Sequence, residues 1–288
     1  MLAGIDSYSY HRRYGELRPG EVAPDQAAWA ADPAPVLAHA DAVGADIVFL
    51  ETCYLPEPEY LTPRMLDARA RVRFSWGHAW PDRLHGLEGG RSRAAEHELA
   101  RWIEAAGRFG HDALRITAGS PASRGDEPAE LLVDRLTGPV QRAVDRASDV
   151  GVRLALENHG DLRASDLLDL LAQVDRGDAL GVCLDNVNLV RVGDDMVDGT
   201  RALAPHATVV HLKDYMSGEI AVTGGPVCTA LGEGVADLPE LLGILDQAGF
   251  DGAVCVELAS LGGNDVDEFS MIGRSVRWLH DNLPRSAK

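Results

Sequence analysis

The 288-residue chain has few basic, few aromatic and few cysteine residues. Its 27 Lys and Arg residues are outnumbered by 45 Asp and Glu residues, which gives a net charge of −18 at pH 7. Nucleic acids and anionic membranes are bound by clustered Lys and Arg, so this charge balance argues against both as partners. Acidic and basic residues are interspersed, as on a solvated surface.

The four cysteines form no CxxC pair of the kind found in zinc ribbons and redox motifs. No run of about 18 apolar residues is present that could span a membrane. The first residues also lack the apolar segment of a signal peptide. We therefore expect a reduced, cytoplasmic protein.

Short apolar segments alternate with longer helical patterns along the chain. Eight segments are expected to be strands: 2–8, 45–52, 72–77, 113–119, 152–158, 180–186, 208–214 and 252–258. Eight more are expected to be helices: 33–43, 62–70, 91–109, 128–150, 163–175, 194–204, 237–248 and 264–282. This pattern predicts an α/β fold, a (β/α)8 TIM barrel in which residues 1–288 form a single domain.

Two further features bear on the fold. An open doubly wound sheet is the alternative, but no GxGxxG motif follows the first strand. The long connection after strand seven, 215–236, contains "TGGP" and "GEG". We expect it to form a loop or hairpin over the mouth of the barrel.

Polar residues follow or end four consecutive apolar segments. Strand five ends at Glu157, strand six ends at Asp185, strand seven carries His211 and strand eight ends at Glu257. Alternation along each strand places these side chains on the face toward the barrel axis. Because the strands of such a barrel end at one common face, we expect the four side chains to converge there.

Three carboxylates and one imidazole in one place indicate a site for a divalent cation. Carboxylates packed together repel one another unless a cation neutralises them. Mn²⁺ is the preferred expectation, although the ligand types alone leave Mg²⁺, Co²⁺ and Zn²⁺ open.

Four segments resemble a known family: "LALENHG" (154–160), "GVCLDNVN" (181–188), "VVHLKD" (209–214) and "GEGVADLPELLGILDQAGFDGAVCVEL" (232–258). They are similar to the xylose-isomerase-like TIM barrels, the sugar phosphate isomerase/epimerase group. This group includes D-tagatose epimerases, inosose dehydratases and the metal subunits of C-glycoside deglycosidases. The resemblance implies a sugar or polyol substrate and one divalent metal ion held by Glu157, Asp185, His211 and Glu257.

The resemblance also implies a mechanism. In the epimerases of this group the two ligand glutamates exchange the substrate proton, which assigns Glu157 and Glu257 as the catalytic acid/base pair. A metal ion on a carbonyl lowers the cost of removing the neighbouring carbon-bound proton, and a carboxylate can remove and return that proton. The leading hypothesis is therefore a metal-dependent isomerase or epimerase of a sugar or polyol.

Two positions depart from the epimerase pattern. Asn188 stands where those enzymes carry a histidine, and an amide can bind a hydroxyl but cannot shuttle protons. Lys213 is expected to point inward, where it could polarise a carbonyl or bind an anionic group. Both leave open a lyase with the same site: a dehydratase of a keto-inositol, or a deglycosidase subunit that eliminates an aglycone from a 3-keto-glycoside.

Further substrate contacts are expected from His159, His11, Trp76 and His78, which follow or end strands five, one and three. Trp76 and His78 are expected to share a face. An aromatic side chain at a barrel mouth can stack on a sugar ring, although Trp is also a common core residue.

Other roles for single residues and other functions for the chain are left open. Glu51 and Arg115, at strands two and four, are expected to be structural ion partners. A non-catalytic sugar-binding or partner subunit, and a homo-oligomer, are left open. A DNA-repair enzyme like endonuclease IV would need a His-rich multi-zinc cluster and a basic groove, which the sequence lacks.

Overall fold

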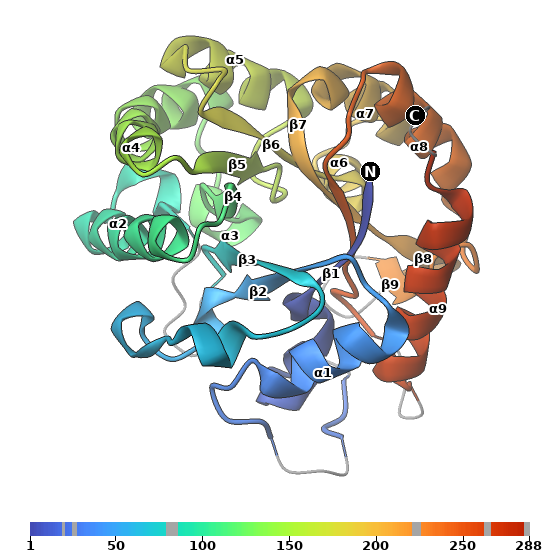
Figure 1. The fold of residues 1–288 in the computed structure, drawn as a ribbon. Coiled ribbons are helices and arrows are strands. Elements are labelled where there is room, and N and C mark those ends of the chain that lie inside the picture. Colours follow the sequence, from blue (N-terminus) through green and yellow to red (C-terminus); the bar gives the residue numbers. More distant parts are fainter. Residues whose placement is uncertain (19–20, 25–27, 79–85, 221–225, 262–265, 285–288) are drawn as a thin grey trace.

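The computed structural model describes the chain except for residues 19–20, 25–27, 79–85, 221–225, 262–265 and 285–288. Eight parallel strands close into a barrel in the order β1-β10-β7-β6-β5-β4-β3-β2 (Figure 1). They are β1 (Leu2–Asp6), β2 (Ile47–Glu51), β3 (Arg71–Trp76), β4 (Ala113–Thr117), β5 (Arg153–Glu157), β6 (Leu180–Asp185), β7 (Ala207–Leu212) and β10 (Ala253–Val256). The predicted TIM barrel is confirmed.

Helices surround the barrel (Figure 1). They are α1 (Ala34–Val43), α2 (Arg93–Arg108), α3 (Pro121–Arg124), α4 (Ala129–Asp149), α5 (Ala164–Val174), α6 (Asn186–Arg191), α7 (Met196–Leu203), α8 (Leu238–Gln247) and α9 (Glu268–Asn282). Across the described residues, no helix combines the length and the apolar character that a membrane span requires.

The structure differs from the predicted elements in the helix expected over 62–70 and in a helix that was not expected. The helix predicted over 62–70 is only a short 3₁₀ turn, Pro63–Leu66, and none of its residues is buried. It therefore has no apolar face that could hold a longer helix against the barrel. The sequence pattern also missed α6, which begins directly after β6 and is capped by the side chain of Asp185.

Alternation along the strands separates two apolar layers. Side chains such as Leu154 join the large core between barrel and helices. A smaller cluster fills the barrel interior: Ile47, Phe49, Ala155, Cys183, Val209, Ala253 and Cys255. Four members of this cluster come two residues before Glu157, Asp185, His211 and Glu257. The inner cluster is therefore the layer directly below those four side chains.

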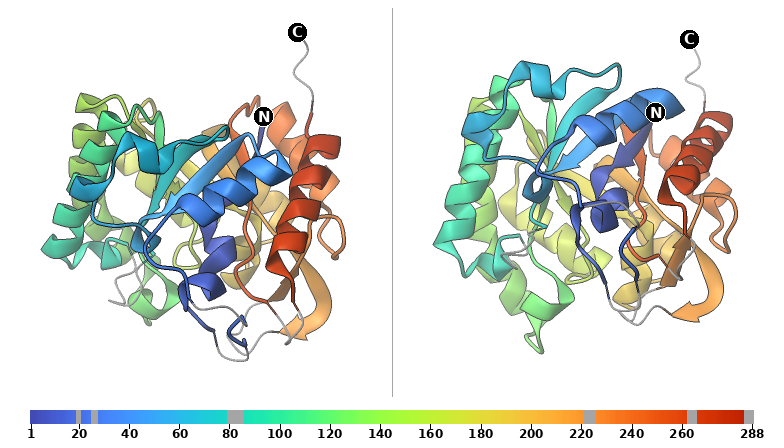
Figure 2. Two further views of the ribbon diagram at one scale, coloured as in Figure 1. Left: turned by 60° about the horizontal axis from the view of Figure 1, so that its bottom comes forward. Right: turned by 90° about the horizontal axis from the view of Figure 1, so that it is seen from below.

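Two connections build up the end of the barrel at which the strands finish (Figure 2). A 3₁₀ helix, η1 (Ser7–Tyr14), follows β1. After β7, β8 (Asp214–Ile220) pairs with β9 (Pro226–Thr229) in an antiparallel hairpin. The structure within the predicted loop or hairpin 215–236 is thus a hairpin, with its tip outside the described residues.

Asp214 ties this hairpin to the segment that follows it. Its buried carboxylate accepts backbone N–H bonds from Tyr215 at 2.9 Å, Gly232 at 3.0 Å, Gly234 at 2.9 Å and Ala236 at 3.1 Å. A Cβ at Gly234 would lie 2.1 Å from Oδ1 of Asp214, so only glycine allows this approach.

Asp214→Ala is expected to lower the free energy of unfolding by about 2–3 kcal/mol, because charge-assisted bonds are lost and buried N–H groups lose their acceptor. Hydrogen exchange should accelerate at residues 232–236 more than elsewhere. Asp246→Ala, at an exposed position of α8, is the matched control and should leave both measurements unchanged. Unaltered exchange at 232–236 in Asp214→Ala would contradict this role.

Candidate metal centre and active site

Four side chains that could hold a metal ion meet at the barrel mouth. Glu157 ends β5, Asp185 ends β6, His211 lies in β7 and Glu257 follows β10. One potential ligand atom of each lies within 4.8 Å of the others, and all four residues are buried. The structure thus brings together the four residues that were predicted to converge.

Two asparagines brace the strand ends that carry these residues. The side-chain amide of Asn158 donates to the carbonyl of Asp185 at 2.9 Å, and its oxygen accepts the N–H of Asp185 at 2.8 Å. Asn186 makes the same two bonds to the backbone of Lys213, both at 2.9 Å. Each amide clamp extends the pairing of neighbouring strands past the end of the sheet and fixes the next polar side chain.

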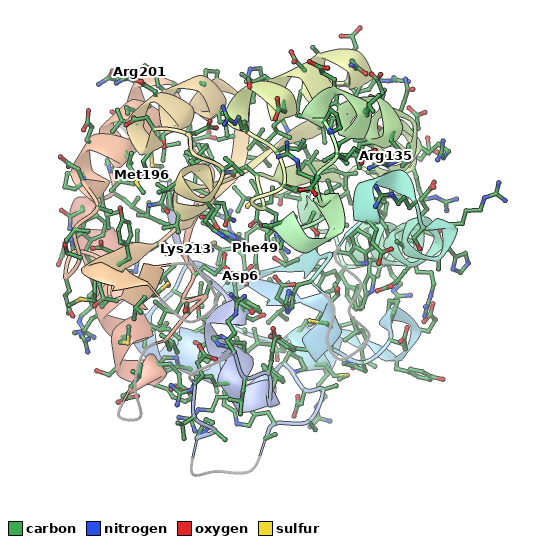
Figure 3. The ribbon with its side chains drawn as sticks, turned by 180° about the vertical axis from the view of Figure 1, so that it is seen from behind. Asp6, Phe49, Arg135, Met196, Arg201 and Lys213 are labelled. Atoms are coloured by element: carbon green, nitrogen blue, oxygen red, sulfur yellow. The ribbon has the colours of Figure 1, made fainter. Side chains whose placement is uncertain are left out.

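Lys213 bridges two of the four candidate ligands and lies near the centre of the barrel (Figure 3). Its Nζ is 2.5 Å from Oδ2 of Asp185 and 3.1 Å from Oε1 of Glu257. Burial alone would lower the pKa of Lys213, but Asp185 and Glu257 outweigh burial and raise it. Burial alone would raise the pKa of Glu257, yet Lys213 and His211 hold it well below its usual range. Lys213 is therefore a cation and Glu257 a carboxylate.

Arg115 connects Glu157 with Glu51 on the neighbouring side of the barrel. Its guanidinium donates to Oε2 of Glu157 and lies 3.2 Å from Oε1 of Glu51, and all three side chains are buried. Burial raises the pKa of Glu51 well above its usual range, although Arg115 opposes this shift. Arg115 therefore contacts Glu51, as expected, although burial favours the neutral form of that carboxyl group, and Arg115 also orients a candidate ligand.

Asn188 holds two of the candidate ligands from the side of α6. Its Nδ2 donates to Oδ2 of Asp185 at 2.8 Å and to Oε1 of Glu157 at 3.2 Å. Its Oδ1 accepts from a guanidinium nitrogen of Arg191 at 3.0 Å. Carboxylates only accept and a guanidinium only donates, so these neighbours determine which way the amide points.

The buried polar groups at the barrel mouth fit a divalent cation. Nδ1 of His211 and Oε2 of Glu257 are 2.6 Å apart, yet in the described part of the chain neither atom makes a hydrogen bond. Arg115 and Lys213 are the permanent cations that contact the surrounding carboxyl groups. They contact four buried carboxyl groups, those of Glu51, Glu157, Asp185 and Glu257, and a fifth, that of Asp6, lies 3.4 Å from Nε2 of His211. A divalent ion would neutralise this excess of acidic groups.

A thiol lies beside the same group. Cys183 together with Glu157 and His211 forms a second arrangement of potential ligands. Burial raises the pKa of Cys183 to about 11, so the thiol keeps its proton at neutral pH. Cysteine binds metals as the thiolate, which makes the carboxylate-rich set the better candidate.

Four of the predicted substrate contacts line a cavity at the barrel mouth: His78, His159, Asn188 and Lys213. Nδ1 of His159 lies 2.7 Å from the carbonyl oxygen of Gly119. Because a carbonyl only accepts, Nδ1 carries the proton and Nε2 is left as an acceptor. Burial and Arg115 hold the pKa of His159 well below its usual range, so the ring is neutral.

His11 does not line this cavity. Its Nε2 is 2.9 Å from a carboxylate oxygen of Glu21, and its Nδ1 is 2.9 Å from the carbonyl oxygen of Tyr8. The ring is fully buried, and both nitrogens are used to anchor η1 to the segment after it. The expectation that His11 contacts substrate is therefore corrected.

Trp76 is also placed elsewhere. It packs into the core between barrel and helices, and its Nε1 donates to Glu98 at 3.3 Å. The face predicted for both Trp76 and His78 does not exist, because β3 ends at Trp76 and Gly77 turns the chain with a φ of 118°. Only His78 reaches the cavity.

Two basic residues of the cavity were not predicted. Arg18 follows η1 and Arg191 ends α6, and both line the cavity. Neither belongs to a motif, since each is an isolated arginine after a strand. The signal that could have found them is their place, shortly after strands one and six, in an otherwise acidic chain.

A family model described as a xylose isomerase-like TIM barrel matches residues 64–281. The chain belongs to this family. The resemblance inferred from the strand-end motifs is thus confirmed. The Escherichia coli (strain K12) protein YihM is 29% identical to this chain over 91 residues. The alignment spans 32% of this chain and 27% of YihM.

Solved structures share the fold at low identity. L-ribulose 3-epimerase is 16% identical, with a TM-score of 0.71 over 98% of this chain and 94% of that one. The IolI protein, solved with a zinc atom, is 14% identical with a TM-score of 0.69 over 98% of both chains. AsbF from *Bacillus anthracis*, a probable 3-DHS dehydratase, is 18% identical with a TM-score of 0.66 over 97% of this chain and 99% of AsbF.

Lys213 contacts oxygens that a metal ion would need, on Asp185 and Glu257. We expect Lys213→Met to bind Mn²⁺ at least about tenfold more tightly, because cations only a few ångströms apart repel strongly. Titration calorimetry of metal-stripped protein measures this. Arg201→Met, on the exposed surface of α7, is the control. An unchanged or weaker affinity in Lys213→Met would contradict the expected competition.

Proposed function

We propose that this chain is a divalent-metal-dependent isomerase or epimerase that acts on a sugar or polyol. The observation that carries the proposal is the convergence of Glu157, Asp185, His211 and Glu257 within 4.8 Å of one another. Membership of the xylose isomerase-like family and the fold shared with L-ribulose 3-epimerase support this class of reaction. Mn²⁺ is the preferred ion, and the zinc atom in IolI keeps Zn²⁺ in consideration.

Glu157 and Glu257 are proposed as the acid/base pair. They come from β5 and β10, with β7 and β6 between them in the barrel, so they approach the cavity from different directions. One of the two groups, as a carboxylate, would remove the proton from the carbon next to the substrate carbonyl. The other, as a carboxylic acid, would return a proton to that carbon. A divalent ion held by the four residues would act as a Lewis acid toward that carbonyl.

Neighbouring side chains would support this proton transfer. Lys213, 3.1 Å from Oε1 of Glu257, would hold that carboxylate in position. Neutral His159 offers Nε2 as an acceptor for a substrate hydroxyl. Asn188 keeps Glu157 and Asp185 in position through its amide group.

A lyase with the same site is the second candidate. It is favoured by Lys213, a buried cation at the cavity, and by Asn188, which cannot shuttle protons as a histidine would. The shared fold of a probable dehydratase, AsbF, is consistent with it. An isomerase forms a product with the same composition as its substrate, whereas a dehydratase forms an unsaturated product and water. Proton NMR of the product distinguishes the two candidates, because it detects the unsaturation.

Glu157→Gln and Glu257→Gln are each expected to reduce turnover by about 100- to 10,000-fold, the usual contribution of general acid–base groups. They should also abolish deuterium exchange from D₂O into the carbon next to the substrate carbonyl. Glu233→Gln, which alters an exposed glutamate paired with Arg274, is the matched control and should behave as wild type. Full metal-dependent turnover in either active-site variant would exclude the proposed pair.

Removal of the metal provides a separate test. Treatment with EDTA is expected to abolish turnover, and Mn²⁺ should restore it. The proposal also requires Asp185→Asn and His211→Ala to weaken Mn²⁺ binding measured by calorimetry. Wild-type affinity in both variants would place the metal elsewhere.

A further inference from the structure

The side chains that line the cavity at the barrel mouth include more cations than carboxyl groups, although the buried groups beneath them and the chain as a whole are acidic. Its lining includes two carboxyl groups, Glu51 and Glu257, and four permanent cations: Arg18, Arg115, Arg191 and Lys213. Arg115 and Lys213 form ion pairs with the buried acids. Arg18 and Arg191 form none: within the described residues, no carboxylate lies within 4.0 Å of either guanidinium.

Arg191 is held over the ends of β5 and β6. Its guanidinium donates to the neutral Oδ1 of Asn188 at 3.0 Å. A Cβ at Gly160 would be in ordinary van der Waals contact with the guanidinium carbon, at 3.6 Å, so Arg191 lies beside the chain that follows β5. The side chain is exposed at the mouth of the cavity, so its remaining N–H groups can reach a bound solute.

Arg18 is fixed on another element of the same cavity. Its guanidinium carbon lies 5.1 Å from the ring centre of Tyr8, and its Nε donates to the Tyr8 hydroxyl at 2.9 Å. That hydroxyl in turn donates to Glu16 at 2.9 Å. The backbone N–H of Arg18 donates to Glu21 at 2.9 Å, which anchors the segment. Arg18 is thus pre-positioned while its charge is left without a directly paired carboxylate.

We propose that the substrate of this site carries an anionic group, a carboxylate or a phosphate, and that Arg191 and Arg18 bind it. This inference rests on the proposed function and narrows its substrate class to acidic sugars or polyols. Guanidinium groups match carboxylate and phosphate oxygens with paired, charge-assisted hydrogen bonds. A neutral sugar would leave both charges unused. Local positive charge also offsets the repulsion that an anion meets from a chain of net charge −18.

Matched ligand pairs test the proposal on the Mn²⁺-loaded protein by titration calorimetry. D-glucuronate is compared with D-glucose, and D-fructose 6-phosphate with D-fructose, so that the two arms separate a carboxylate site from a phosphate site. At least one anion should bind about 10- to 100-fold more tightly than its neutral partner. This preference should fall as the salt concentration rises.

Substitutions of Arg191 test whether this side chain binds the anionic group. Arg191→Gln should reduce the preference for the anion by about 10- to 100-fold, because the affinity for the anion falls much more than the affinity for the neutral sugar. Arg191→Lys keeps the charge but not the paired geometry and should show an intermediate loss. Arg201→Gln, which alters an arginine paired with Asp198 on α7, should match wild type.

Three results would overturn the proposal: no detectable binding of either anion, equal or tighter binding of the neutral sugars, or an equal loss for neutral and anionic ligands in Arg191→Gln. They are separable from a failure of the proposed function. Metal-dependent turnover of neutral ketoses without preference for acids would overturn only the anionic substrate. Anion binding that is independent of Mn²⁺, in a protein that does not bind Mn²⁺, would overturn the metal-dependent reaction.

Discussion

The balance of charge among the buried carboxyl groups at the barrel mouth governs the rest of the site. Arg115 and Lys213 lie against Glu157, Asp185 and Glu257 and offset the repulsion among these carboxylates. Removing one partner of a buried ion pair leaves an uncompensated charge and is strongly destabilising. The same arrangement leaves the ring nitrogens of His211 and one carboxylate oxygen of Glu257 without a hydrogen-bond partner among the described residues. Folding and the proposed metal binding thus depend on one set of side chains.

A repeated local device positions these charges. In both "EN" at 157–158 and "DN" at 185–186, an acidic residue that ends a strand is followed by an asparagine that clamps the backbone 27 residues later. The first clamp acts on Asp185 and the second on Lys213. The acidic residue and the brace for its neighbour are therefore adjacent in sequence. This explains why a strand that reads as core ends in a run of polar residues.

The parts of the site that could be predicted are those that depend on one strand at a time. Period-two alternation places Glu157 and His211 inward and Leu154 outward without any knowledge of the neighbours. Contacts between elements could not be read in this way. The bond from Arg191 to Asn188 needs a short helix after β6 that no hydrophobic pattern announces, and Trp76 was misplaced because a positive φ at Gly77 interrupts the alternation.

The apolar layer inside the barrel determines from which end a solute can reach the acidic groups. Phe49, Val209 and Cys255 belong to a cluster that lies below the acidic groups and separates them from the other end of the barrel. The barrel interior is thus closed below the acidic groups, and a solute would reach them from the end where the strands finish. A ligand that fills this cavity would exclude water from it. The electrostatic contacts of Lys213 and Arg115 would then act in a drier and less polarisable medium, in which they are stronger.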